Sequence, residues 1–236
     1  MNIKEECITL LKLKNIKIRD YRKLDKINGR IINVTISKEL DNTYYVSVVV
    51  EEDIINPKFI PTTIIGLDLG IKDLVITSNY QKYQNEKVIE KYEKRIKQKQ
   101  KRLSKKIRGS HNYYKLKCEI ARIYKKIKNA RKYIIHHITK DITDNNDIVV
   151  FETLKVKNMV KKSLFSKINR RCIIIWNNKT SSQICSHCGY KNLLLKKLNI
   201  REYTCPNCNY ELDRDVNTAI NICFQGLKSY MNEVCA

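Results

Sequence analysis

The sequence is short of the residues that interrupt or loosen a chain, since its 236 positions hold only six glycines and three prolines. So few turn formers leave little room for flexible linkers or low-complexity tracts. The sequence also lacks an apolar run near the ~18 residues that a membrane span needs, and its N-terminal residues lack the continuous apolar core of a signal peptide. The hydrophobic content of 42% is ordinary for a globular protein, and the length allows one full domain with a sizeable core or one domain plus a small appendage. We therefore expect a soluble, cytoplasmic protein.

Acidic residues are the second shortage, with 24 Asp and Glu against 47 Lys and Arg and a formal net charge of +23. A chain with this charge repels itself unless it meets a polyanion. Nucleic acid is the expected partner, because each neutralised phosphate releases counterions, and an anionic membrane surface is the rival partner. Binding to DNA would place the protein at the nucleoid.

Most of the excess charge lies in one segment. Residues 81–140 hold 21 Lys and Arg against 4 Asp and Glu, and 21 − 4 gives +17 of the total +23. A solvated helix face explains many charge runs, but so lopsided an excess favours a surface that faces phosphates. The predicted contacts to nucleic acid are Lys94, Arg95, Arg102, Lys105, Lys106, Arg108, Lys125, Lys126 and Arg131.

Within residues 86–139, apolar residues recur at spacings of three and four, which predicts two helices that pack along a seam. Gly109 can end the first helix and Ser110 can cap the second, so we expect an antiparallel helical hairpin. The longer seam comprises Leu116, Ile120, Ile123, Ile127, Ala130, Ile134 and His137, and the shorter one comprises Ile89, Tyr92, Ile96 and Leu103.

Runs of β-branched and apolar residues predict the strands. Residues 30–37 and 43–51 flank a turn and indicate a hairpin, and residues 62–69 read as a fully buried strand followed by an antiparallel one at 74–77. Residues 147–151 and 171–176 are further strand candidates, so we expect an α/β fold with a mixed sheet. A last helix is expected over residues 215–230, with one side formed by Val216, Ile220, Cys223, Phe224 and Leu227.

Four of the nine cysteines form two C-x-x-C pairs, Cys185 with Cys188 and Cys205 with Cys208, with sixteen residues between the pairs. In a cytosolic protein, paired cysteines more often hold a metal than form disulfides. Each turn offers two thiolates at adjacent corners of a tetrahedron, and two turns close a structural zinc site without an open position for catalysis.

The residues around the pairs fit a zinc site. Gly189 follows the first pair and Asn209 follows the second, and both residue types tolerate the positive φ that such turns use. His187 lies inside the first pair but is not needed, since four sulfurs suffice. The basic residues of the intervening segment, which would suit a ribbon touching nucleic acid, are Lys191, Lys196, Lys197 and Arg201.

Three carboxylates stand at the edges of apolar elements. Asp68 ends one buried run, Glu152 ends another, and Asp215 opens the last helix. If these elements are neighbours, the three acids can converge on two divalent ions, which activate a water and stabilise the leaving oxygen of a phosphodiester. The alternative for each acid is a cap or a solvated strand end, and Asp215 could simply cap its helix.

Four motifs occur in one order: GLDLGIK at 66–72, FETLKVKNM at 151–159, the C-x-x-C pairs, and DRDVNTAIN at 213–221. Together they resemble the RuvC-type nuclease half of the TnpB family, the transposon-encoded, RNA-guided DNA endonucleases related to type V CRISPR effectors. The resemblance implies an RNase H-like core with an inserted basic hairpin and a zinc ribbon. It also implies a role in transposition and DNA recombination, with DNA as partner and a guide RNA from the element's own flank.

Carried over by position, the resemblance makes Asp68, Glu152 and Asp215 the catalytic acids that would hold magnesium or manganese. Thr153 stands where that family usually has an Asp, and Thr218 replaces one Ala. The implied domains are a β-rich wedge-like remnant at 1–60, a first core part at 61–184 with the hairpin at 86–139, a zinc ribbon at 185–208, and a C-terminal core helix at 209–236.

Two departures from the family leave alternatives open. The sequence begins later than is usual, and residues 159–171 are shorter than the segment in which the family places an amphipathic helix. Both suggest a naturally shortened product, so the alternative to a metal-dependent DNA endonuclease is an inactive DNA- or RNA-binding remnant or a transposition accessory. A third class, the actin- and hexokinase-like ATPases, shares the Asp-x-Gly motif, but the charge and the lack of a second glycine-rich phosphate loop argue against it.

Overall fold

The computed structural model describes residues 2–4, 7–9, 16–19, 29–52, 60–152, 172–176, 181–192 and 201–234. The chain divides into two compact units, Met1–Pro57 and Lys58–Ala236, and each is described by itself. The predicted short stretch at 159–171 and the loop residues Lys196 and Lys197 lie outside the described residues. None of the described helices is both long and apolar enough to span a bilayer.

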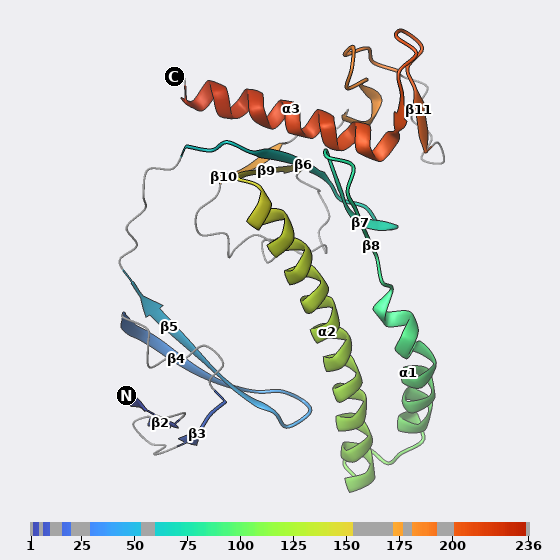
Figure 1. Ribbon diagram of the computed structural model, residues 1–236. Helices are drawn as coiled ribbons and strands as arrows, with labels where there is room; N and C mark the ends of the chain where they lie inside the picture. Colours follow the sequence, from blue (N-terminus) through green and yellow to red (C-terminus); the bar gives the residue numbers. More distant parts are fainter. Residues whose placement is uncertain are drawn as a thin grey trace. The chain divides into compact units, whose positions relative to one another are not determined.

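The first unit contains two small antiparallel sheets. Strands β1 (Asn2–Lys4), β2 (Cys7–Thr9) and β3 (Ile16–Lys17) form one sheet in that order. Strands β4 (Arg30–Lys38) and β5 (Tyr44–Glu51) pair as the predicted hairpin (Figure 1). Its turn closes through an N–H of Asn42 that donates to the Glu39 carbonyl at 3.0 Å, with Asn42 at a φ of 65°.

The second unit is built on a five-stranded mixed sheet in the order β10-β9-β6-β7-β8. Its strands are β6 (Ile64–Asp68), β7 (Asp73–Thr77), β8 (Lys82–Gln84), β9 (Ile148–Glu152) and β10 (Cys172–Trp176). Strand β9 lies parallel to both β6 and β10, whereas β7 runs antiparallel to β6 and β8 antiparallel to β7. The predicted mixed sheet is therefore confirmed.

Asp147 fixes the starts of the two central parallel strands. Its carboxylate accepts the N–H groups of Thr62 and Thr63 at 2.9 and 3.0 Å, and the Thr62 hydroxyl at 2.9 Å. The Asp147 N–H in turn donates to the Thr63 hydroxyl oxygen at 2.9 Å. These bonds lower the pKa of Asp147 to about 2, because they favour the charged carboxylate. These hydrogen bonds fix the register of β6 and β9, in which Ile64 lies opposite Ile148.

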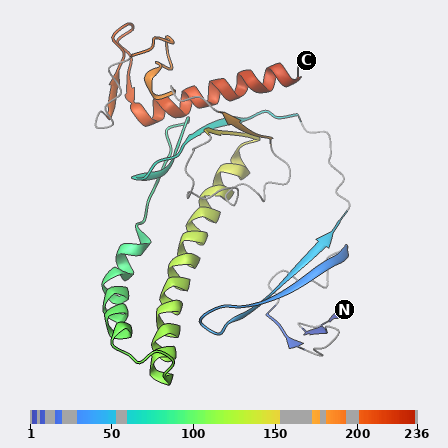
Figure 2. The same ribbon diagram turned by 180° about the vertical axis from the view of Figure 1, so that it is seen from behind.

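Three helices complete this unit: α1 (Val88–Ser104), α2 (His111–Asn145) and α3 (Arg214–Val234). Helices α1 and α2 run side by side between β8 and β9, and α2 and α3 lie on opposite faces of the sheet (Figures 1 and 2). Ile138 and Ile142 of α2 pack with Leu67 and Val149, while Ile222 of α3 packs with Val150. Both faces of the central strands are thus buried, which explains their continuous apolar runs.

Gly66 allows α3 to lie close against β6. A Cβ atom at this position would lie 2.2 Å from the Ala219 carbonyl oxygen and 2.6 Å from the Cys223 nitrogen. Gly226 makes the reciprocal approach from the helix, since its Cβ would lie 2.4 Å from the methyl groups of Val150. Two glycines therefore set the distance between α3 and the sheet.

Several details of the predicted helices were wrong. In α1, the buried residue at the start of the helix is Val88, whereas the predicted Ile89 is exposed. In α2, the predicted His137 is exposed, and the buried seam continues instead through Ile138 and Ile142. The reason is that α2 runs past residue 139 to Asn145 and turns from packing on α1 to packing on the sheet.

The ends of the helices and the buried side of α3 need further corrections. Helix α1 ends at Ser104, so Gly109 lies in the connecting loop, whereas the Ser110 hydroxyl caps α2 by accepting the Tyr113 N–H at 3.2 Å as predicted. On α3, Phe224 is 58% exposed and Leu227 is 36% exposed. Val216 is buried as predicted, but the close glycine contacts bring Ala219, Ile222 and Gly226 to the sheet as the rest of the buried stripe.

Candidate active site and metal centre

Asp68 and Glu152 lie at the same edge of the sheet. Each is the last residue of its strand, and β6 and β9 are parallel with Leu67 opposite Phe151. The following residue of each strand therefore emerges at the carboxyl edge, where adjacent parallel strands bring their ends together. Asp215 joins this edge from the first turn of α3.

The electrostatics of Asp68 show that the three acids are close enough to interact. Burial, the charge of Asp215 and the charge of Glu152, in that order, raise the pKa of Asp68 to about 7. The Leu69 N–H and the charge of Arg214 oppose this rise. A carboxyl whose ionisation is resisted by burial and by two like charges is typical of a site that a cation would complete.

Asp213, and not Asp215, caps helix α3. One Asp213 carboxylate oxygen accepts the N–H groups of Asp215 and Val216 at 2.9 and 3.3 Å, and the other receives the Lys82 ammonium at 2.5 Å. The alternative role of Asp215 as the helix cap is therefore wrong. The Asp215 side chain is left for other contacts. The rule that Asp favours the position just before a helix could have identified Asp213 from the sequence.

Arg201 holds the Asp215 carboxylate. Its guanidinium donates to Asp215 Oδ2 at 2.8 Å. Among the described residues, the cysteine cluster is the only group of three or more Cys, His, Asp or Glu side chains placed so that it could hold a metal ion. The three acids thus share one edge of the sheet without the close convergence of a formed metal cluster.

The four predicted cysteines, in contrast, do converge. Their sulfurs all lie within 4.8 Å of one another, with Cys185 and Cys208 at 3.8 Å and Cys188 and Cys205 at 3.6 Å. Cys185 and Cys205 are buried, and Cys188 is exposed. Four thiols at these spacings could hold one metal ion in a tetrahedral site and would leave no coordination position open to water or substrate.

The two turns that present the thiols are near copies of each other. The Gly189 N–H donates to the Cys185 carbonyl and the Asn209 N–H donates to the Cys205 carbonyl, both at 2.9 Å. Gly189 and Asn209 have φ values of 75° and 54°, which confirms the positive φ predicted at both places. The ring of His187 stacks on Tyr210 with centroids 5.1 Å apart, so this histidine packs against the ribbon.

The thiol chemistry also fits a cation. Burial raises the pKa of Cys205, but the N–H groups of Asn207 and Cys208 outweigh it and bring the value to about 6. For Cys208, the Tyr210 backbone hydrogen bond lowers the pKa, but burial and the neighbouring thiols raise it to about 12. The thiolate is therefore favoured at Cys205 and resisted at Cys208, and a bound divalent cation would remove that conflict.

Two asparagines that the sequence analysis gave no role anchor the cysteine segment to α3. The Asn217 side chain accepts the Ser186 N–H at 2.8 Å and donates to the Ile184 carbonyl at 2.7 Å. The Asn221 side chain donates to the same Ile184 carbonyl at 2.7 Å. Asn217 is fully buried, and a buried amide of this kind needs such partners. Their spacing of four residues places both asparagines on one side of the helix, and this spacing was the signal in the sequence that could have identified them.

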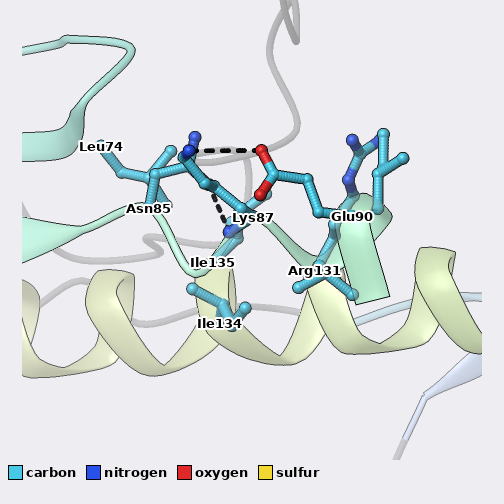
Figure 3. A pocket seen from close by; sticks show the side chains of 9 residues that line it. Leu74, Asn85, Lys87, Glu90, Arg131, Ile134 and Ile135 are labelled. Carbon is cyan, nitrogen blue, oxygen red and sulfur yellow. Dashed lines mark hydrogen bonds and ion pairs between the residues drawn. The ribbon is translucent and has the colours of Figure 1, made fainter. Parts of the chain in front are cut away.

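The predicted nucleic-acid contacts lie on α1, on α2 and in the loop between them. All of them are exposed except Lys125, which is half-buried. Arg131 also lines a cavity of about 400 Å³ between the start of α1 and the middle of α2 (Figure 3). Lys87 and Glu90 form an ion pair of 3.2 Å at its rim, and Ile134 forms part of its wall. None of the three acids at the sheet edge lines this cavity.

Sequence comparison identifies the family. The model of a family described as probable transposase, OrfB_IS605, matches residues 46–163, which is half of the chain. The chain belongs to the OrfB_IS605 family. A second model, described as the Cas12f1-like TNB domain, matches residues 162–222 and so covers the cysteine segment of this OrfB_IS605 protein.

Two curated relatives extend the similarity over most of the chain. A putative RNA-guided DNA endonuclease of Streptomyces pristinaespiralis is 32% identical over 214 residues, covering 82% of this chain and 52% of the relative. The putative RNA-guided DNA endonuclease InsQ of Escherichia coli K12 is 26% identical over 240 aligned residues, covering 87% and 59%. The chain thus spans little more than half the length of these relatives.

Solved structures share the fold of this OrfB_IS605 chain. It matches a CRISPR-Cas12f ternary complex with a TM-score of 0.50, and a Cas12f1–sgRNA–target DNA complex with a TM-score of 0.52. Each match covers 80% of this chain and 44% of the other at 18% identity. At this identity the similarity concerns the fold, which is α/β with a mixed sheet.

Proposed function

We propose that this chain carries a RuvC-type nuclease core that hydrolyses DNA phosphodiesters. The observation that carries the proposal is that Asp68 and Glu152 lie at the ends of adjacent parallel strands and that Asp215 of α3 is near enough to help raise the pKa of Asp68. The strand order β10-β9-β6-β7-β8, in which only β7 runs against the others, supports an RNase H-like core. The names of the relatives support an RNA-guided reaction with DNA as the substrate.

The proposed domains follow from the same argument. Residues 61–184 and 209–236 form the nuclease core, the hairpin at 86–139 binds nucleic acid, residues 185–208 form a zinc ribbon, and residues 1–60 form a β-rich wedge-like remnant. Zinc suits the ribbon because four thiolates in a tetrahedron are its preferred ligands. A guide RNA from the flank of the element, and DNA at the nucleoid, are the proposed partners.

In the proposed mechanism, Asp68, Glu152 and Asp215 would hold two magnesium or manganese ions. Such ions supply an activated water and stabilise the leaving oxygen of the phosphodiester. Burial of Asp68 strengthens its attraction for a cation because the charge is poorly solvated. Asp213 fixes the first turn of α3, which carries Asp215, while the Arg201 guanidinium would compete with a metal for the Asp215 carboxylate.

A second candidate function is nucleic-acid binding without cleavage. It is favoured by the ion pair between Arg201 and Asp215 and by the absence of a tight carboxylate cluster among the described residues. In that case the basic hairpin and the ribbon would bind DNA or RNA as a remnant or an accessory of transposition.

The test is cleavage of labelled single- and double-stranded DNA by the purified chain with Mg²⁺ or Mn²⁺, with and without RNA from the flank of the element. We expect Asp68→Ala to lower the cleavage rate by at least about 100-fold without weakening DNA binding. Asp144→Ala is the matched control, since it removes an exposed carboxylate at the end of α2. Cleavage that survives Asp68→Ala, or binding without cleavage under every condition, would refute the nuclease proposal.

A further inference from the structure

One side of helix α2 combines exposed aromatic rings with positive charge. Between Ile120 and Lys140 the helix contains seven Lys and Arg residues and no Asp or Glu. Tyr133 is 71% exposed, and its ring lies 6.3 Å from that of His137, centroid to centroid, at an interplanar angle of 40°. His137 is also exposed.

These rings form part of a continuous line along the helix. Steps of four, seven, four and three residues keep neighbours on one side of an α-helix, because its period is 3.6. All five members of this line are exposed, away from the residues that pack on α1 and on the sheet. We call this line the outer stripe of α2, and it consists of Arg122, Lys126, Tyr133, His137 and Lys140.

We propose that the outer stripe of α2 is a stacking platform for unpaired bases of single-stranded nucleic acid, with Tyr133 as the principal ring. This inference rests on the proposed nucleic-acid binding by the hairpin and adds to it a preference for bases that are not paired. None of the residues predicted from the sequence to contact nucleic acid is aromatic, so phosphate contacts alone would give no such preference.

Two properties of the stripe select this partner. Lys126 and Lys140 lie one heptad on either side of Tyr133, so a backbone that follows the helix meets a cation before and after the ring. A base that leaves this backbone can lie on the Tyr133 ring, because every base offers a π face and stacking of this kind tolerates any sequence. A paired duplex buries those faces and would contact the cations alone. An acidic protein could form ion pairs with the lysines, but it has no bases to stack on the aromatic rings.

The test is fluorescence anisotropy of the full zinc-loaded chain, without Mg²⁺ or Mn²⁺, on three oligonucleotides of about 20 nucleotides: oligo(dT), oligo(U) and an abasic DNA of equal charge. We expect Tyr133→Ala to weaken binding of the two base-containing strands about tenfold, and binding of the abasic strand less than about twofold. Tyr133→Phe keeps the ring and should bind like the wild-type chain, and Tyr133→Leu should resemble Tyr133→Ala.

The charge control is Lys126→Gln, which should weaken binding of all three strands alike and reduce the salt dependence by about 0.7 in slope. Losses on both oligo(dT) and oligo(U) support the shared chemistry, and a loss on only one of them supports the platform and identifies the strand as DNA or RNA. Equal losses on the abasic strand, wild-type binding of the base-containing strands by Tyr133→Leu, or no binding of those strands by the wild-type chain would overturn the proposal. The test does not measure cleavage. A chain that binds in this way but never cleaves DNA would therefore support the stacking platform and contradict only the nuclease proposal.

Discussion

Arg201 binds Asp215 through its side chain and binds the residue before Asp215, Arg214, through its backbone. The Arg201 guanidinium donates to the Asp215 carboxylate at 2.8 Å, and the Arg201 carbonyl accepts the N–H of the preceding residue, Arg214, at 2.8 Å. Arg201 stands just before β11 (Glu202–Thr204), which pairs with β12 (Glu211–Asp213) beside the cysteine cluster. The cysteine segment therefore reaches directly to one of the three proposed catalytic acids.

Removing the Arg201 side chain should strengthen Mn²⁺ binding. In Arg201→Ala, Asp215 loses a cation that competes for the same carboxylate oxygen, so we expect the dissociation constant to fall about three- to tenfold. Isothermal titration calorimetry of the wild-type and variant chains measures this change. Arg201→Lys should stay near wild type, as should Lys191→Ala, which removes an exposed cation of the same segment. Unchanged affinity in Arg201→Ala would show that the ion pair does not oppose the metal.

Replacing Gly66 with alanine should destabilise the second unit strongly. The added methyl group would lie 2.2 Å from the Ala219 carbonyl oxygen, and neither β6 nor α3 can retreat without opening the sheet core. We expect a loss of about 3 kcal/mol in the free energy of unfolding, measured by urea denaturation. Gly109→Ala is the control, because nothing lies within 4 Å of its added Cβ. That control should cost only about 1 kcal/mol, for its φ of 87°. Similar losses in the two variants would contradict the close-packing argument.

Loss of one cysteine ligand should remove the metal and unfold the ribbon. Cys205→Ser leaves only three thiols in the cluster, so we expect the zinc content to fall from about one ion per chain to near zero, with a lower melting temperature. Metal analysis and thermal unfolding measure the two effects. Cys118→Ser, which removes a half-buried thiol of α2, should keep its zinc. Full zinc content in Cys205→Ser would mean that the cluster is not the site.

The stabilising effect of Asp147 should depend on pH in a defined window. Its pKa in the folded chain is lowered from 3.8 to about 2, so the ionised carboxylate favours folding. The stability difference between the wild-type chain and Asp147→Asn should be fully present above about pH 4 and should shrink as the pH falls toward 2. Denaturant unfolding at a series of pH values measures this difference. Asp144→Asn serves as the control, as an exposed carboxylate three residues away. A stability difference that grows as the pH falls toward 2 would contradict the predicted direction.

The local signals in the sequence predicted the central elements well. Continuous apolar runs identified β6 and β9 because a strand covered on both faces has no polar side. The cysteine spacing and the positive φ at Gly189 and Asn209 were predictable because the ligand turns depend only on a few neighbouring residues. The Ser110 cap was predictable for the same reason.

Contacts between distant segments decided the remainder. The buried face of α2 changes along the helix, because its first half packs on α1 and its last turns pack on the sheet. The exposure of Phe224 could not be predicted, since two glycines on separate elements set how α3 is rotated against the strands. From the sequence, Arg201 is a basic loop residue, and only the pairing of β11 with β12 brings it to Asp215.

The sequence by itself determined the charge, the strand runs, the four thiols and the order of the three acids, because each depends on composition or on short spacing. The tertiary structure alone decided that Asp213 caps α3, that Arg201 occupies Asp215, and that burial with two like charges raises the pKa of Asp68. Those properties arise from residues up to 147 positions apart in the chain, and no local pattern specifies how such residues meet.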